Sequence, residues 1–132
     1  MATIPVGLKG ELRRQVTDDI AINFLGLDGA RVLATPFMIN LIEMTCRDSI
    51  LKLLDPGFDS VGTEVNVKHL AATPLGMHVT FNSEVIAVDD RRIRFKVTAF
   101  DDKEQVAEGT HERFVINVER FAKRLKEKMQ GQ

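Results

Sequence analysis

Glu43 places a carboxylate in an apolar stretch of the sequence and is the leading candidate for a catalytic residue. Glu43 lies at helical spacing from Ile39, Cys46 and Ile50, so a helix through this segment places all four side chains on one stripe. Burying a carboxylate without a partner costs on the order of several kcal/mol or forces its protonation. A polar group should therefore face Glu43. Two interpretations are open: a tuned carboxylate in a cleft, or a partly exposed structural ion pair.

His69 is the candidate partner of this carboxylate. It shares strand parity with Val65 and Val67 and should point to the same apolar face. Alone it fits a hydrogen-bonded core histidine, but an inward Glu on a helix beside an inward His on a strand is what general acid–base catalysis requires. Thr35 adds a hydroxyl at the start of the helix, where it would also be the N-cap. Thr35 and Glu43 lie about 12 Å apart along a helix, which leaves room for a substrate group.

The other nucleophilic and metal-binding residue types indicate no second site. His78 and His111 lack metal-ligand spacing to any Cys, Asp or Glu cluster, and we interpret both as surface or packing residues. Cys46 lies on the apolar stripe without a His partner, which favours packing. As the single cysteine it can form no internal disulfide, which fits a reducing compartment. We expect no metal site and no cofactor.

Length and composition limit the function classes further. The 132 residues fit one domain, and 44 % hydrophobic and 28 % charged residues are ordinary for a globular protein. The formal charge of -1 and the absence of Trp and Tyr give no basis for nucleic-acid binding. The N-terminus lacks the pattern of an export signal, and no apolar run approaches the ~20 residues that span a bilayer. We expect a cytoplasmic protein without membrane association.

One long helix must position Thr35 and Glu43. The Thr35-Pro36 pair precedes an apolar run from Phe37 to Leu54, and the sequence Asp55-Pro56-Gly57 ends it. The apolar residues of this run cover more than one stripe, which indicates a helix enclosed by other structure.

The other segments predict strands and a second helix. Period-two alternation predicts a hairpin of Met77 to Val88 and Ile93 to Ala99 around Asp89-Asp90, with Ala87 on the inward face and a bulge at Gly109 in a later strand. The further strands are expected at Glu11 to Thr17, Val61 to Leu70 and Gln105 to Val118, and a basic helix is expected from Glu119 onward.

This order predicts an α+β protein with the hotdog fold: an antiparallel sheet wrapped around one long central helix, followed by a C-terminal helix. We expect residues 1–132 to form a single domain. A small sheet leaves an exposed edge strand and covers the helix incompletely, so we also expect a homodimer.

Three blocks of this sequence resemble one family. Residues 32–44 (VLATPFMINLIEM), 62–74 (GTEVNVKHLAATP) and 108–113 (EGTHER) are similar to motifs of the fluoroacetyl-CoA thioesterase-like family of hotdog proteins, in family order. The resemblance covers about residues 8 to 125. It implies a homodimer that hydrolyses acyl-CoA thioesters and needs no cofactor besides the coenzyme A of its substrate.

The resemblance also implies roles for particular residues. Carried over by position, Thr35, Glu43 and His69 form the catalytic set, Gly62 matches a glycine near the thioester, and Arg113 matches an arginine of the active-site region. We list Phe37, in the first block, with Gly62 and Arg113 as substrate-binding.

One segment departs from the family pattern. The fluoroacetyl-selective enzyme looks to have aromatic lid residues shortly before its active-site Thr, whereas residues 24–30 here read FLGLDGA, with Gly26 and Gly29 in their place. We therefore expect weak discrimination between fluoroacetyl and acetyl groups.

The working hypothesis is hydrolysis of a short acyl-CoA in a cleft at a subunit interface. Glu43 attacks the thioester or activates water, and His69 assists proton transfer. The alternative is a non-catalytic acyl-CoA or fatty-acyl binding module on the same fold. An enoyl-CoA hydratase shares the fold class but has no further support in the sequence.

Overall fold

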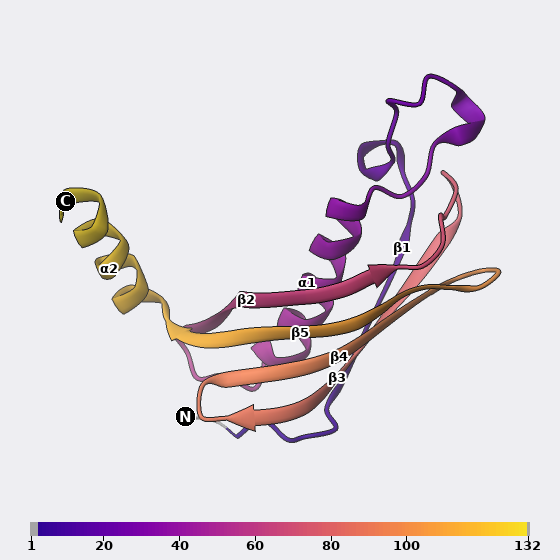
Figure 1. Ribbon diagram of the computed structural model, residues 1–132. Helices are drawn as coiled ribbons and strands as arrows, with labels where there is room; N and C mark the ends of the chain where they lie inside the picture. Colours follow the sequence, from indigo (N-terminus) through magenta and orange to yellow (C-terminus); the bar gives the residue numbers. More distant parts are fainter. Residues whose placement is uncertain (1–2, 132) are drawn as a thin grey trace.

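The computed structural model describes residues 3–131, which form an antiparallel sheet and two α-helices (Figure 1). Short 3-10 helices at Asp18–Ile20 and Asp28–Ala30 lie between the first strand and the first helix. The predicted fold class and order of elements are confirmed. The strands are β1 (Lys9–Gln15), β2 (Phe58–His69), β3 (His78–Asp89), β4 (Arg92–Asp101) and β5 (Gln105–Asn117), and the helices are α1 (Thr35–Leu51) and α2 (Val118–Gly131).

The sheet has the strand order β1-β3-β4-β5-β2, and every neighbouring pair is antiparallel. α1 packs against β1, β2, β3 and β5 on one face of this sheet (Figure 1). Met38, Ile42, Cys46 and Ile50 of α1 are almost completely buried, as is Phe81 of β3. The curved sheet therefore covers one face of the helix. Phe37, Asn40 and Asp48 on the rest of α1 are exposed, so the predicted enclosure is only partial within one chain.

α1 begins one residue earlier than the sequence predicts. Ala34 occupies the N-cap position and makes no side-chain cap, while Thr35 and Pro36 lie in the first turn. The prediction that Thr35 is the N-cap is therefore wrong, because its hydroxyl is turned toward β2 instead. The helix ends at Leu51, not Leu54, since the chain passes into turns closed by hydrogen bonds such as Leu53 N–H to the Ile50 carbonyl.

The predicted bulge at Gly109 is wrong. Gly109 lies in regular register between Val67 of β2 and Val97 of β4. A glycine is needed there for a different reason, since a Cβ would stand 2.1 Å from the Asn66 carbonyl oxygen. The close approach of β2 and β5 therefore depends on this position.

Bulges occur elsewhere and displace the side-chain alternation. The register of β3 against β4 shifts between Val85 and Ala87. Val85 is buried, but Ile86, Ala87 and Val88 are all exposed. The predicted inward position of Ala87 is therefore wrong, because an extra residue reverses the faces beyond it. The other strand bounds differ from the predicted ones by at most three residues.

No helix among residues 3–131 has the length and apolar character needed to cross a bilayer.

Candidate active site

Thr35 and His69 form the first of two polar clusters beside α1. Thr35 lies in the first turn of α1 and His69 is the last residue of β2. The threonine Oγ1 and the histidine Nδ1 are hydrogen-bonded at 2.8 Å, with the donor set by the histidine tautomer. This contact confirms that His69 faces the helix, as the strand parity predicts.

The surroundings of His69 favour the neutral imidazole. Its Nε2 is buried and has no hydrogen-bond partner among residues 3–131. Burial lowers the pKa of His69 below its ordinary value of 6.5, and the backbone of Ala71 offsets part of this effect. A neutral histidine beside a hydroxyl can accept or pass on a proton near pH 7.

A hollow of about 430 Å³ opens beside this pair. Thr35 and His69 supply its polar groups, and Phe24 contributes an aromatic ring that is 77 % exposed. The other lining residues are Ile22, Val32, Leu33, Leu70, Ala71 and Ala72. The hollow is thus an open recess with more polar than apolar lining surface, and a threonine hydroxyl and an imidazole lie at one side.

Glu43 belongs to the second cluster. Its Oε2 lies 3.4 Å from Nη1 of Arg113, and the Glu43 side chain is 37 % exposed whereas that of Arg113 is 6 % exposed. A Cβ placed on Gly62 would stand 2.9 Å from the same oxygen. The carboxylate therefore lies against the bare backbone of β2, with a buried cation on one side and solvent on the other.

Arg113 is held by several further hydrogen bonds. Its Nε donates to Ser60 Oγ and its Nη2 to the Ser60 carbonyl, both at 2.7 Å. Nη1 donates to His111 Nε2 at 3.2 Å as well as to Glu43. Burial lowers the pKa of Arg113, and the carboxylate of Glu43 opposes this effect. These bonds fix the guanidinium plane, so one N–H group is aimed at the carboxylate.

His111 completes the second cluster. Its Nδ1 donates to the Glu64 carbonyl at 2.7 Å, so Nε2 is free to accept from Arg113. Burial lowers the pKa of His111, which keeps this tautomer neutral. Its ring is also stacked on Phe95 with centroids 6.2 Å apart. The interpretation of His111 as a packing residue is confirmed, but the sequence reasoning missed its link through Arg113 to Glu43.

The structure does not join Glu43 to His69 within one chain. The partner that the apolar stripe demands for Glu43 is Arg113, and the partner of His69 is Thr35. The contact points Gly62 and His69 are seven residues apart on β2, a span of about 23 Å in an extended strand. The predicted catalytic set is therefore divided between two places along the same edge of the molecule.

The start of α1 offers backbone donors near the first cluster. The N–H of Met38 bonds to the Ala34 carbonyl, and Pro36 has no N–H group. The N–H groups of Thr35 and Phe37 have no partner in the described part of the chain. Phe37 is 43 % exposed at this turn, so its ring is available to a ligand. A helix N-terminus with free donors favours negative charge.

Cys46 is not equipped for nucleophilic chemistry. It is fully buried on α1, and burial raises the pKa of its thiol to about 12. This agrees with the packing interpretation. Residues 3–131 also contain no cluster of three or more His, Cys, Asp or Glu side chains arranged to hold a metal ion.

The sequence profile of the fluoroacetyl-CoA-specific thioesterases matches residues 16–119. The chain belongs to this family. The fluoroacetyl-CoA thioesterase of Streptantibioticus cattleyicolor is 41 % identical over 97 residues, which cover 74 % of this chain and 70 % of that protein. As a fluoroacetyl-CoA-specific thioesterase family member, the chain is an acyl-CoA thioester hydrolase, and the predicted enzyme class and resemblance are confirmed.

Solved structures support this membership. The fluoroacetyl-CoA thioesterase FlK superposes with a TM-score of 0.87 at 33 % identity, over 96 % of this chain and 98 % of that one. A hypothetical protein of Thermus thermophilus, a thioesterase superfamily member, gives 0.86 at 27 % identity with both chains fully covered. A hot-dog-like protein from Thermanaerovibrio acidaminovorans gives 0.88 at 26 % identity, over 97 % and 95 % of the two chains. The hotdog fold of this family member is therefore shared along nearly its whole length.

Proposed function

We propose that the protein hydrolyses a short acyl-CoA thioester at a composite site, in which Glu43 of one subunit acts with Thr35 and His69 of its partner. The observation that carries this proposal is the position of the two clusters. Both lie along β2, which is an edge of the sheet, and one chain alone keeps them apart.

The exposed edge of β2 supports pairing with a second copy. In residues 3–131, β2 pairs within the sheet with β5 only, and residues 62–66 are exposed. An edge that carries Val65 at 38 % exposure is a template for strand addition. Antiparallel pairing of two β2 strands about the Val65–Asn66 peptide brings Gly62 opposite His69 of the partner subunit. Glu43, which lies against Gly62, then faces the partner's His69.

The composite site has the groups needed to hydrolyse a thioester by either of two routes. Glu43 either attacks the thioester carbonyl carbon or takes a proton from the water that does. When the carbon–sulfur bond breaks, the partner's neutral His69 relays a proton to the coenzyme A sulfur. This proton comes from the water that is consumed: Glu43 passes it on in the water route, and in the anhydride route it comes from the water that hydrolyses the anhydride. The products are the free acid and coenzyme A. In the first route, one water hydrolyses the acyl–glutamate anhydride and releases the acid. Each route therefore consumes one water in total.

The first turn of α1 suits the developing oxyanion. The free N–H groups of Thr35 and Phe37 lie at the positive end of a 17-residue helix, and the Thr35 hydroxyl is already oriented by His69. We propose that these groups hold the carbonyl oxygen, while Gly62 leaves room for the thioester beside Glu43. Arg113 then positions the Glu43 carboxylate from behind rather than contacting the acyl group.

We propose short acyl groups as substrates, with weak selection for fluorine. Selecting fluorine over hydrogen requires a tightly organised pocket that excludes water. Here Gly26, which has φ 74°, and Gly29 carry no side chains to build such a cover, and Phe24 is largely exposed at the rim of the hollow. The segment therefore suits several small or branched acyl groups.

We further propose that the enzyme works as a cytoplasmic homodimer, without nucleic-acid or membrane partners and without a cofactor or metal. The proposed Thr, Glu and His groups supply the proton transfers and the nucleophile themselves, and the coenzyme A belongs to the substrate.

The test is thiol release from a panel of two- to five-carbon acyl-CoAs and fluoroacetyl-CoA. We expect turnover of several members and a preference for fluoroacetyl-CoA over acetyl-CoA well below about 1000-fold, or ~4 kcal/mol. Glu43→Gln should lower turnover about 100-fold or more, as loss of a general base or nucleophile commonly does, with folding retained. Normal turnover by the folded Glu43→Gln variant would show that Glu43 is only part of a structural ion pair and not a catalytic residue.

A further inference from the structure

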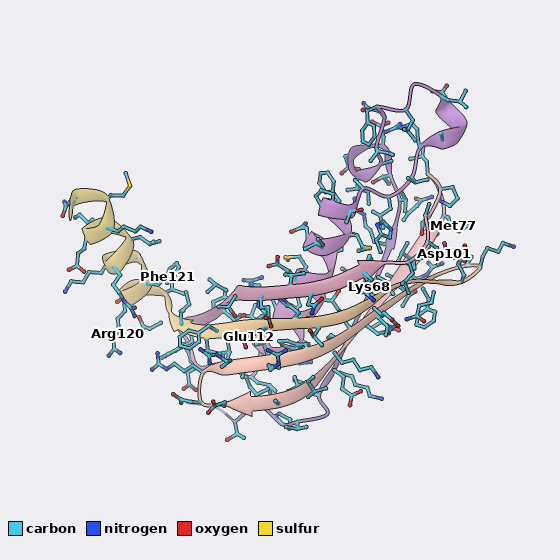
Figure 2. The ribbon with its side chains drawn as sticks, in the orientation of Figure 1. Lys68, Met77, Asp101, Glu112, Arg120 and Phe121 are labelled. Atoms are coloured by element: carbon cyan, nitrogen blue, oxygen red, sulfur yellow. The ribbon has the colours of Figure 1, made fainter. Side chains whose placement is uncertain are left out.

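α2 is an amphipathic helix whose apolar face has no cover. Val118, Phe121, Leu125 and Met129 recur at spacings of three and four, so they share one face. Val118, Leu125 and Met129 are 46 %, 48 % and 87 % exposed, and none of the described residues of α2 is buried. Figure 2 shows Phe121 at the junction with β5, while the rest of α2 stands clear of the sheet. Isolated helices of this length are marginal in water, so α2 needs a surface to pack against.

The polar face of α2 is basic. The helix carries five Lys and Arg against two Glu, a net charge of +3. Cations flank the apolar stripe on both sides, so a matching surface should be apolar with an acidic border. The cations are Arg120, Lys123, Arg124, Lys126 and Lys128.

Residues 18–30 form such a surface. They contain three Asp and no Lys or Arg, a net charge of -3. Phe24, Leu25 and Leu27 are 77 %, 58 % and 70 % exposed between the acidic residues. Asp18 and Asp19 form ion pairs with neighbouring arginines, whereas Asp28 has no ion pair within residues 3–131. The segment therefore offers apolar side chains and one unpaired carboxylate.

These two surfaces lie at opposite ends of β2 and cannot meet within one chain (Figure 1). Phe58, the first residue of β2, pairs with Asn117, directly before α2. His69, the last residue of β2, lies beside Thr35 and residues 18–30. Antiparallel pairing of two β2 strands reverses these ends. The α2 end of one subunit is then adjacent to the residue 18–30 end of the other.

We propose that α2 of one subunit packs across residues 18–30 of its partner and covers the hollow beside Thr35 and His69. This inference rests on the β2-paired dimer of the proposed function. The apolar stripe of α2 would contact Phe24, Leu25 and Leu27, with its cations around Asp28. A helix supplied by the second subunit thus covers the mouth of the hollow, while Gly26 and Gly29 still leave the acyl pocket without tightly packed side chains.

The test is disulfide trapping between two separately made chains. Leu27→Cys is made in a chain carrying a size tag, and Met129→Cys in an untagged chain. Cys46 is buried, with its pKa raised to about 12, so it does not compete for the oxidant. After the two chains are refolded together and mildly oxidised, we expect a disulfide product that contains one chain of each size. Ile86→Cys, at a comparably exposed apolar position on β3, should give no such product with Met129→Cys.

The outcomes separate this inference from the proposed function. A dimer in sedimentation that never forms the mixed disulfide overturns the inference and leaves the β2-paired thioesterase intact. Binding of the wild-type chain, and not of a Leu125→Asp/Met129→Asp variant, to phosphatidylserine vesicles also overturns it, because the stripe would then serve a lipid surface. If α2 covers the hollow as proposed, the Leu125→Asp/Met129→Asp variant has a KM about tenfold higher than the wild-type chain, while kcat changes little. Absence of thiol release from the wild-type chain contradicts the proposed function, whatever the disulfide shows.

Discussion

Gly62 lies directly against the carboxylate of Glu43, and the absence of a side chain on Gly62 permits this contact. A Cβ on Gly62 would stand 2.9 Å from Oε2 of Glu43 and 3.1 Å from Cε1 of His111. The edge strand thus reaches the Glu43 carboxylate with backbone alone. A substrate or a second subunit that binds at β2 therefore meets Glu43 without an intervening side chain.

Gly62→Ala should impair catalysis more than folding. The new methyl group displaces the Glu43 carboxylate from Arg113, so we expect kcat to fall about tenfold or more, with a stability loss of about 1–3 kcal/mol from overpacking. Thiol-release kinetics and urea unfolding check the two effects. Gly131→Ala is the matched control, since a Cβ there meets nothing within 4 Å, and it should change neither quantity. Equal activity of the two variants would contradict the role of Gly62.

Arg113→Lys should destabilise the protein although the charge is kept. A lysine cannot replace the donors that hold Ser60, His111 and Glu43 at the same time. We expect a loss of about 2–4 kcal/mol in the free energy of unfolding, because buried acceptors lose their partners. Arg92→Lys, whose side chain is 55 % exposed, is the control and should cost less than about 0.5 kcal/mol. A loss no larger than the control's would show that the guanidinium fork is dispensable.

How far the sequence predicts this molecule depends on the range of the interactions. Local periodicity predicts α1, the hairpin and the edge strand, because it follows from neighbouring side chains. The N-cap at Thr35 and the face of Ala87 were predicted wrongly, since a contact to β2 and a bulge decide them. Neither is visible in local sequence.

The partner of Glu43 shows the same limit. The apolar stripe correctly demands a polar partner, but Arg113 is 70 residues away and depends on the register of β5 against β2. One signal was available: His111 and Arg113 alternate with the buried Val115, so all three face inward on β5. Two inward cation-capable side chains are as unusual as an inward carboxylate, and together they predict a buried network.

The stability of the protein should fall as the pH drops below neutral. Burial lowers the pKa of both His69 and His111 below the ordinary 6.5, so the unfolded chain binds protons that the folded chain does not. Their stabilising contribution is complete above about pH 6.5. It is lost as the pH falls through the lowered values. Urea midpoints between pH 8 and pH 4.5 should therefore decrease toward acid, and less steeply for His111→Gln. If the urea midpoint of His111→Gln changed with pH as steeply as that of the wild-type chain, His111 would not be a cause of the acid destabilisation.

Cys46 should resist thiol reagents while the protein is folded. With its pKa raised to about 12 by burial, almost no thiolate exists at pH 8. We expect a colorimetric disulfide reagent to label the native chain at the rate of global unfolding, and to label it at once in concentrated urea. Rapid labelling of the native protein would contradict the burial of Cys46.

The most direct test of the composite site is complementation between two inactive variants. Glu43→Gln and His69→Asn chains are refolded together from urea, and thiol release is compared with each variant alone. If each site takes Glu43 from one subunit and His69 from the other, every mixed dimer keeps one intact site. Random reassortment then restores about a quarter of wild-type activity. Activity of the mixture no greater than the mean of the separate variants would contradict the account, because the catalytic residues would then come from one chain.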